Sequence, residues 1–286
     1  MMDWPVVSVI IPSYNRAGVI EKAVRSVLNQ SYTALELIVV DDGSADNTKQ
    51  VLEEIKDSRL RYVYQANAGA CAARNHGASL ARGKYIAFHD SDDIWHSDKL
   101  EKQLKVLQQT DADVVVCKMN RFSADGTYVR YPKRINEGFI TAQDDLFGIG
   151  TQTIIAKRNV LEAVSFRPEM PRYQDLEWFI HTLQSFKVYC MDEALVDYYI
   201  GADSISKGTG RMYAAFELLK KYYPELRTKS PALAMHIARD LLSGWKKTVR
   251  KAPKENAKYL TLAWQYLPSL GSCVKTLCSL KQRSKR

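Results

Sequence analysis

The sequence has few cysteines, and they are not placed to form disulfides or a zinc site. The five cysteines include no CxxC pair and are odd in number, which predicts a protein of a reducing compartment. No run approaches the roughly 18 apolar residues of a membrane-spanning helix, and the first residues lack the basic region that begins a signal peptide. No nucleic-acid-binding module is recognisable either. We therefore expect a cytoplasmic protein that does not bind nucleic acid.

Charge is spread unevenly along the chain, although a content of 46% hydrophobic and 26% charged residues is ordinary for a globular protein. From residue 205 onward there are 18 Lys and Arg against 4 Asp and Glu, whereas residues 1–204 have 23 basic and 28 acidic residues. The net charges are therefore +14 and −5, which indicates two parts of different chemistry. We expect a first domain over residues 1–206 and a basic helical extension over residues 207–286.

The first ninety residues alternate between continuous apolar strands and helices. Strands are predicted at 6–12, 35–40, 59–64 and 84–88, with helices at 19–30, 48–55 and 69–81 between them. This alternation is typical of an α/β fold, with a mostly parallel sheet and helices on both faces. Ligands of such sheets bind beyond the carboxyl ends of the strands. Polar clusters stand at all four of these ends, at 12–16, 41–44, 67–75 and 90–93, and they predict one site.

The fourth of these strands is followed by three acids within four positions. If the backbone stays extended through Ser91, Asp90 and Asp92 project to the same side, because side chains alternate along a strand. Two hard oxygen ligands at a strand end suit Mg²⁺ or Mn²⁺ held between the protein and a phosphate. The alternative is a solvated acidic turn that leads into the next helix.

Taken together and in this order, the four clusters resemble the motifs of the family 2 glycosyltransferases of GT-A fold. The resemblance covers roughly residues 6–200, and it is carried by VIIPSYN at 9–15, VVDDGSAD at 39–46, NAGACAARN at 67–75 and DSDD at 90–93. It implies an enzyme that transfers a sugar from a nucleotide-sugar donor, usually a UDP-sugar. It also implies a divalent metal, Mn²⁺ or Mg²⁺, and inversion at the anomeric carbon.

The resemblance places the donor in the loops that follow the strands. It implies that Asp41 or Asp42 accepts a hydrogen bond from the nucleotide base, and it favours Asp42. The glycine that follows, Gly43, lets the backbone turn sharply there. The alternative is a plain Asp-Gly turn that caps a helix. For Arg74 the alternative to binding the ligand is an ion pair with an acid of the sheet. The other residues expected to bind the nucleotide-sugar are Pro12, Ser13, Asn15, Asn67, Gly69, Asp90 and Ser91.

The resemblance also implies a metal site after the fourth strand. The metal is assigned chiefly to Asp92, with Asp93 as the alternative, while Asp90 contacts the ribose and the sugar. The metal would neutralise charge on the departing diphosphate. His89 is expected in the core rather than as a ligand, and Trp95 is expected to pack under the helix that follows.

Inversion in a single displacement requires a general base on the acceptor side. Asp175 matches the position of the base in the family, and His181 is the alternative. A helix N-terminus would lower the pKa of Asp175 and a closed pocket would raise it, so the direction stays open. The competing roles are helix capping for Asp175 and surface exposure for Glu177. By analogy with the family, Thr151 and Gln152 would contact the acceptor.

The basic extension is expected to form helices at 213–223, 230–249 and 254–267 and a shorter one to 280. In the second of these, an apolar residue recurs every four positions, at Leu233, Ile237, Leu241, Trp245 and Val249. This stripe either packs on the first domain or docks on anionic lipid, where each basic residue adds about 1 kcal/mol. We expect the lipid surface, because the charge exceeds what solubility requires, and hence a peripheral position on the inner face of the membrane.

The function predicted from the sequence is an inverting, metal-assisted glycosyltransferase for cell-surface polysaccharide synthesis, with a glycan or lipid-linked saccharide as acceptor. One alternative is a sugar-nucleotide nucleotidyltransferase, which would normally have a glycine- and lysine-rich loop after the first strand. Residues 13–18 supply no such loop. The other alternative is a non-catalytic scaffold at the membrane surface, and the acids at the strand ends favour chemistry over it.

Overall fold

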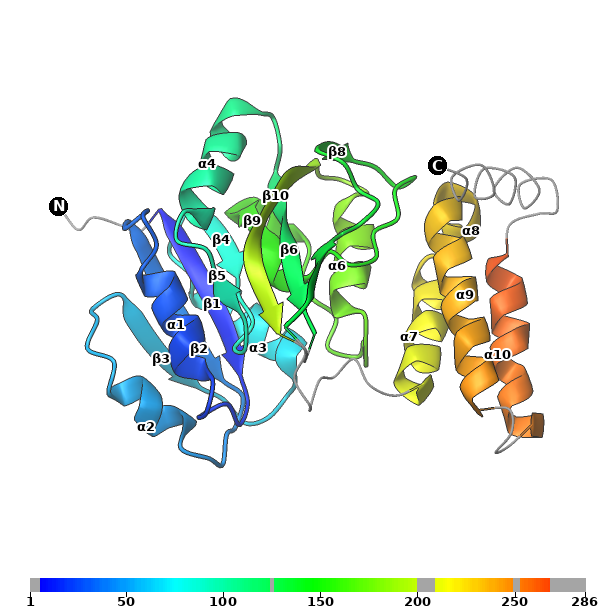
Figure 1. Cartoon of the computed structure of the whole chain (residues 1–286), viewed down its shortest axis with the longest axis horizontal. Coiled ribbons are helices and arrows are strands. Elements are labelled where there is room, and N and C mark those ends of the chain that lie inside the picture. Colours follow the sequence, from blue (N-terminus) through cyan, green and yellow to red (C-terminus); the bar gives the residue numbers. More distant parts are fainter. Residues whose placement is uncertain (1–5, 124–125, 200–208, 249–252, 268–286) are drawn as a thin grey trace. The chain divides into compact units, whose positions relative to one another are not determined.

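The computed structural model of the chain describes residues 6–123, 126–199, 209–248 and 253–267. Its chain contacts divide into two compact units (Figure 1). The sheet unit comprises the chain up to Thr141 together with Gly148–Glu169 and Gln174–Ile205. The helical unit comprises the chain from Ser206 onward together with two short segments from the middle, Ala142–Phe147 and Met170–Tyr173. The middle of the chain therefore contributes to both units.

The first half of the sheet unit has the alternating pattern that the sequence predicts. Its strands pair in parallel in the order β3-β2-β1-β4. They are β1 (Val7–Ser13), β2 (Leu35–Asp41), β3 (Leu60–Tyr64) and β4 (Tyr85–Phe88), connected by α1 (Ile20–Leu28), α2 (Thr48–Glu53) and α3 (Ala70–Leu80). Because the strands are parallel, their carboxyl ends meet at one edge of the sheet.

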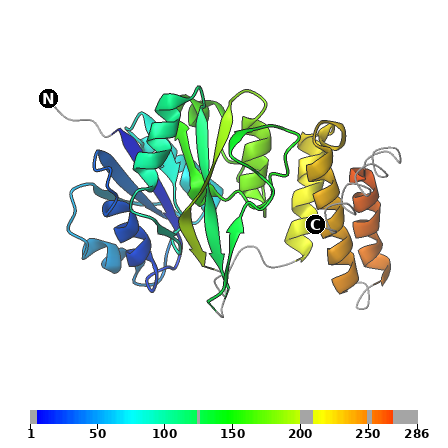
Figure 2. The same cartoon turned by 45° about the horizontal axis from the view of Figure 1, so that its top comes forward.

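The second half of the sheet is mixed, and within the described part of the chain it extends the sheet to ten strands. β9 pairs antiparallel with β4 and β6, whereas β10 runs parallel to β6 (Figure 2). β10 is one long strand, and its register with β6 is irregular between Cys190 and Val196. The strands are β5 (Ile94–Trp95), β6 (Val114–Phe122), β7 (Tyr128–Tyr131), β8 (Gly138–Ile140), β9 (Ile154–Lys157) and β10 (Val188–Tyr199), and the helices are α4 (Lys99–Gln109), α5 (Arg158–Ala163) and α6 (Gln174–Thr182).

Alternation along β1 decides which helices pack on each face of the sheet. Val7, Val9 and Ile11 are fully buried in one core cluster with the apolar faces of α1, α2 and α4. Ile10 points to the other face, where α3 approaches so closely that a Cβ on Gly77 would lie 2.5 Å from Ile10 Cγ2. This close packing explains the glycine at position 77, because it leaves no room for a side chain there.

Among the residues that the structure describes, the helical unit contains four helices, all in the C-terminal part of the chain. α9 packs against α7, α8 and α10 (Figure 1). The helices are α7 (Thr209–Tyr222), α8 (Leu226–Lys229), α9 (Pro231–Thr248) and α10 (Pro253–Tyr266). Within the described ranges, no helix combines the length and the hydropathy that crossing a bilayer would need.

The apolar stripe of α9 lies in the core of the helical unit. Leu233, Ile237 and Leu241 are fully buried, and Trp245 is half-buried. The expectation that this stripe docks on lipid is therefore wrong, because it is already covered by the neighbouring helices. Val249 and the shorter helix suggested to end at 280 lie outside the described residues.

Candidate functional site

The loops that follow β1 and β2 are tied together by hydrogen bonds. The backbone N–H of Asn15 donates to Ser44 Oγ at 2.8 Å, and the N–H of Ala45 donates back to Asn15 Oδ1 at 2.8 Å. The N–H of Ala17 donates to Asp46 Oδ2 at 3.0 Å. Asn15 adopts φ +52°, a left-handed conformation that asparagine tolerates better than most residues. The two loops therefore form one assembly at the carboxyl edge of the sheet.

Asp42 joins the loop between β3 and α3 to this assembly. Its Oδ1 accepts from the N–H of Ala68 at 2.8 Å and from Gln65 Nε2 at 2.7 Å, and its Oδ2 accepts from the N–H of Gly69 at 2.8 Å. The side chain is only 3% exposed. A carboxylate has about four acceptor positions, so three of those of Asp42 are used within the protein. Its predicted contact with a nucleotide base stays a prediction.

Asp41 also binds groups within the protein. Its Oδ1 accepts from the N–H of Ser44 and its Oδ2 from the hydroxyl of Tyr62, both at 2.8 Å. Burial, together with the charge of Asp41, raises the pKa of Tyr62. Gly43 has φ +82°, and a Cβ there would lie 2.9 Å from the N atom of Asn67. The turn of the Asp-Gly alternative is therefore present, but the residue before α2 is Asn47, so neither Asp41 nor Asp42 caps that helix.

The acidic motif after β4 forms a turn rather than an extended continuation of the strand. The N–H of His89 still donates to the carbonyl of Ile10, but the N–H of Asp93 then reaches the carbonyl of Asp90 at 3.4 Å. Of the two alternatives weighed from the sequence, the extended backbone is therefore wrong and the turn is present, although Asp93 in this turn is buried rather than solvated. The physical reason is that the pairing of β4 with β1 ends here, because the chain turns to form β5, which pairs antiparallel with β10.

Asp90 is the centre of a polar cluster that joins three further elements. Arg74 Nη2, from α3, forms an ion pair with Asp90 Oδ1 at 2.8 Å, and Arg74 Nη1 donates to Gln174 Oε1 at 3.2 Å. Thr151 Oγ1 donates to the same Asp90 oxygen at 3.2 Å. Arg74 therefore pairs with an acid of the sheet, the alternative weighed from the sequence, and its contact with the donor stays a prediction.

Asp92 and Asp93 differ in exposure. Asp93 is 1% exposed; its Oδ1 accepts from the N–H of Tyr199 at 3.2 Å, while its Oδ2 is buried without a hydrogen-bond partner in the described structure. Burial, then the charges of Asp90 and Asp92, raise the pKa of Asp93 well above its usual range. Asp92 is half-buried; burial and Asp90 raise its pKa, and the Arg16 guanidinium opposes them.

The carboxylates of Asp92 and Asp93 are suited to bind a cation whose other ligands come from a bound substrate. A cation would relieve the repulsion that raises their pKa values and would suit the unsatisfied oxygen of Asp93. Among the residues that the structure describes, no three His, Cys, Asp or Glu side chains are grouped closely enough to hold a metal by themselves. A metal here would therefore take its remaining oxygen ligands from a phosphate and from water.

Asp175 lies in the first turn of α6, one residue after the Gln174 that binds Arg74. It is inside the helix rather than at the capping position before it, so the capping role is wrong. Burial raises the pKa of Asp175, as does the charge of Asp90, while Arg74 and the N–H of Leu176 oppose this. Burial therefore outweighs the helix dipole, and the direction left open by the sequence is upward.

Several neighbours of these residues are buried. Glu177 is fully buried and accepts from Arg167 Nε at 2.7 Å, so the expected surface exposure is wrong. Gln152 is 3% exposed, and its carbonyl accepts from Trp95 Nε1 at 3.0 Å. Of the two residues suggested for the acceptor, only Thr151 directs its side chain to Asp90. Trp95 and His89 are in the core, as predicted.

The remaining residues predicted to bind the donor fall into two groups. Pro12, Ser13 and Ser91 are buried, and Ser13 Oγ has no hydrogen-bond partner within the described structure. Asn67 and Gly69 are exposed. Sequence reasoning did not single out Arg16, whose charge acts on Asp92. The available signal was that Arg16 is the only cationic residue in the first polar cluster.

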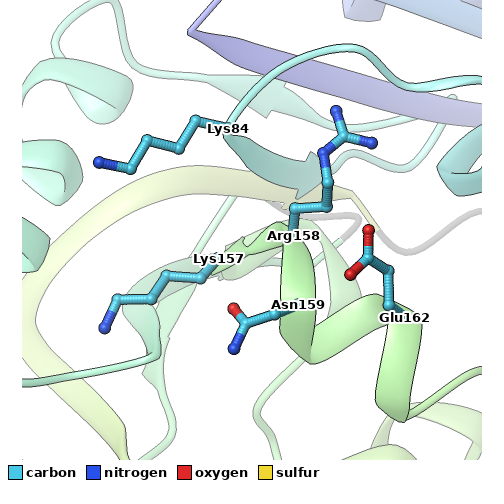
Figure 3. A pocket seen from close by; sticks show the side chains of 5 residues that line it. All are labelled: Lys84, Lys157, Arg158, Asn159 and Glu162. Carbon is cyan, nitrogen blue, oxygen red and sulfur yellow. The ribbon is translucent and has the colours of Figure 1, made fainter.

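A separate pocket of about 390 Å³ lies at the other end of β4 (Figure 3). It is lined by Lys84, Lys157, Arg158, Asn159 and Glu162. The Arg158 guanidinium donates to the carbonyls of Ala81 and Gly83, and Lys157 Nζ pairs with Asp113 at 2.9 Å. Two of its three cations are thus bound within the protein, and the pocket is distinct from the acidic site.

The sequence of this chain is similar to those of known glycosyltransferases. Residues 8–166, more than half of the chain, match the profile of Glycosyl transferase family 2. The chain belongs to this family. TuaG of Bacillus subtilis, a putative teichuronic acid biosynthesis glycosyltransferase, is 37% identical over 217 residues, 72% of this chain and 84% of that relative. WfgD of Escherichia coli, named as a UDP-Glc:alpha-D-GlcNAc-diphosphoundecaprenol beta-1,3-glucosyltransferase, is 37% identical over 169 residues, 58% of this chain and 65% of that relative.

Solved structures show the same fold at lower sequence identity. S. aureus TarS in complex with UDP-GlcNAc has a TM-score of 0.62 and 19% identity, covering 91% of each chain. The mannosyltransferase PcManGT from Pyrobaculum calidifontis, in complex with GDP-Man and Mn²⁺, has a TM-score of 0.63 and 18% identity, covering 96% of this chain and 87% of that one. The family resemblance and the GT-A fold are thereby confirmed, and the protein is a glycosyltransferase.

Proposed function

We propose that this family member transfers a sugar, with inversion, from a UDP-sugar to a glycan or lipid-linked saccharide in the synthesis of a cell-surface polysaccharide. The names of two relatives support this, because one refers to teichuronic acid and the other to UDP-Glc and a diphosphoundecaprenol acceptor. The observation that carries the proposal is the partly buried carboxylate of Asp175, with a raised pKa, one residue after the Arg74–Asp90–Gln174 cluster.

Asp175 is the proposed general base. A carboxylate whose pKa is raised by burial binds a proton more readily than an exposed one and is better matched to neutral pH. In the proposed step, Asp175 accepts the proton of the acceptor hydroxyl while that oxygen forms a bond to the anomeric carbon. The bond from this carbon to the diphosphate oxygen breaks on the opposite face, and the nucleoside diphosphate leaves with the electron pair.

Asp92, with Asp93 as the alternative, is the proposed ligand of Mn²⁺ or Mg²⁺. When bound, such a metal neutralises negative charge on a diphosphate. The residues of the chain supply the rest of the donor site. Arg16 adds positive charge beside Asp92. The ion pair with Arg74 holds the carboxylate of Asp90 in one orientation, which supports its proposed contact with the ribose and the sugar.

The helical unit is proposed to bind an anionic membrane surface from the cytoplasmic side. Its buried stripe is not the contact, but other side chains suit the role. Lys246 and Lys247 on α9 and Lys258 on α10 are exposed, and α10 also exposes Leu260 and, at 73%, Trp264. Basic side chains beside exposed tryptophan and leucine are typical of helices that lie in a lipid interface.

The proposal is tested by measuring UDP release from a panel of UDP-sugars with an oligosaccharide or lipid-linked acceptor, first with Mn²⁺ and then with EDTA. Asp175→Asn is expected to lower kcat by about 100-fold or more, the contribution of a general base. The control is Glu162→Gln, an exposed substitution at the other end of β4, which should leave the rate unchanged.

Two results would contradict parts of the proposal. Turnover that persists in EDTA would exclude the metal, and full activity of Asp175→Asn would exclude this base. Pyrophosphate release from UTP and a sugar phosphate would instead support a nucleotidyltransferase, and nucleotide binding without turnover on any donor would support a scaffold.

A further inference from the structure

Two side chains of α9, one helical turn apart, each bind one of the two segments that the middle of the chain contributes to the helical unit. His236 Nδ1 lies 3.0 and 3.1 Å from the two carboxylate oxygens of Asp145. The hydroxyl of Tyr173 donates to Asp240 Oδ2 at 3.2 Å. Asp145 belongs to the segment Ala142–Phe147 and Tyr173 to Met170–Tyr173. The same face of α9 therefore holds both segments.

Aromatic packing reinforces both attachments. The ring of Tyr173 stacks on Phe216 of α7, with centroids 4.9 Å apart and planes 10° from parallel. The ring of Phe147 stacks on His236 at 3.7 Å and meets Tyr173 edge-on at 5.6 Å. Phe216 is fully buried. Tyr173 is thus held at its ring by stacking and at its hydroxyl by a hydrogen bond to a carboxylate.

The backbone of Tyr173 needs such support. Its φ is +58°, the left-handed region that a bulky residue rarely adopts because its Cβ crowds the backbone. Residues persist in this conformation where the surrounding contacts over-determine it. Tyr173 is the last residue before α6, which begins at Gln174, and Asp175 follows at once. The chain therefore passes directly from Tyr173, in the helical unit, into the helix that carries Asp175.

We propose that Tyr173 and Asp240 are positioning residues for Asp175. The helical unit holds Tyr173 in its left-handed conformation, and Tyr173 fixes the first turn of α6 with the carboxylate that it carries. This inference rests on the proposed role of Asp175 as the base. It gives the helical unit a part in the acceptor-side chemistry that is independent of any lipid contact.

The kinetic test compares Tyr173→Phe and Asp240→Ala, which remove the same hydrogen bond from its two ends. Each is expected to lower kcat about fivefold to tenfold, the effect of losing one hydrogen bond to a charged group. KM for the UDP-sugar should stay unchanged, because the loops after β1 to β4 are untouched. The double variant should be no slower than the worse single variant. Ser243→Ala, an exposed change on the same helix, is the matched control.

A second readout needs no substrate. Hydrogen exchange of the backbone amides of residues 174–182 is expected to accelerate in Asp240→Ala and Tyr173→Phe but not in Ser243→Ala, because the first turn of α6 is released. A general loss of folding would instead accelerate exchange throughout the sheet unit, so β1 and β2 serve as the internal reference.

The outcomes separate this inference from the proposed function. If Asp175→Asn is inactive while Tyr173→Phe and Asp240→Ala keep the kcat and the α6 exchange of the wild type, the positioning role is overturned and the base is not. If Asp175→Asn is fully active, the base itself is overturned, whatever the exchange shows. A rise in KM for the UDP-sugar with unchanged kcat would also overturn the positioning role.

Discussion

At the scale of single residues, the site shows how burial decides the chemistry of an acid. Asp92 and Asp93 are adjacent in sequence, yet one is half-buried and the other is 1% exposed. Asp175 sits at a helix start that should lower its pKa, but burial raises it. The sequence identifies which side chains follow the strand ends, whereas their exposure depends on residues far away in the chain.

The raised pKa of Asp175 predicts the pH dependence of the reaction. A base acts when it is deprotonated, so kcat/KM should be full above the raised pKa and should fall as the pH drops through it. The midpoint is expected above about 3.9, the usual value for aspartate. The measurement is the pH–rate profile of the wild type beside that of Glu162→Gln, which should share it. An acid limb at the ordinary aspartate value would contradict the assignment.

At the scale of helices and strands, the sequence predicts best where a pattern is local. The four parallel strands and the helices between them follow from apolar runs and loop residues, and their ends agree with the structure to within a few residues. The sequence left an extended backbone and an acidic turn both open after β4, because the choice depends on β5 pairing with β10, about 100 residues further along. Glu177 was also misplaced, since its side chain is fully buried and pairs with the half-buried Arg167.

The close packing of α3 on the sheet predicts that replacing Gly77 destabilises the protein. In Gly77→Ala the new Cβ would meet Ile10 Cγ2 at 2.5 Å and Val40 Cγ2 at 3.2 Å. The free energy of unfolding is expected to fall by about 1–3 kcal/mol from overpacking, although alanine favours helices by about 1 kcal/mol. Urea unfolding measures the change.

The matched control for this substitution is Gly210→Ala in α7, where a Cβ would meet nothing within 4 Å. It should leave stability unchanged or raise it slightly, through helix propensity alone. Equal effects of the two substitutions would show that α3 is not packed as closely on β1 as the structure has it.

At the scale of the whole molecule, the net charge of +9 is the sum of two parts of opposite sign. The sequence shows that asymmetry directly. It does not show that the two segments Ala142–Phe147 and Met170–Tyr173 join the helical unit, because that depends on side chains of α9 some 65 to 90 residues later.

The basic helical unit predicts binding to anionic vesicles. Co-sedimentation with phosphatidylglycerol vesicles should exceed that with phosphatidylcholine vesicles and should weaken as salt rises. The pair Lys246→Glu and Lys247→Glu is expected to reduce binding, as is Trp264→Ala. The control pair, Lys22→Glu and Lys49→Glu, makes the same charge change at exposed sites of α1 and α2. Equal losses from both pairs would contradict a defined lipid-binding face.

The division of the chain also has a consequence for the order of events on the ribosome. The segment that ends at Tyr173 is translated well before α7 and α9, so a nascent chain has neither Phe216 nor Asp240 available to it. A growing polypeptide can complete its parallel strands while the residue ahead of Asp175 still lacks its partners. Full transferase activity would then be reached only after the last helices have been synthesised. A chain that is truncated before them would bind the nucleotide but would transfer the sugar slowly.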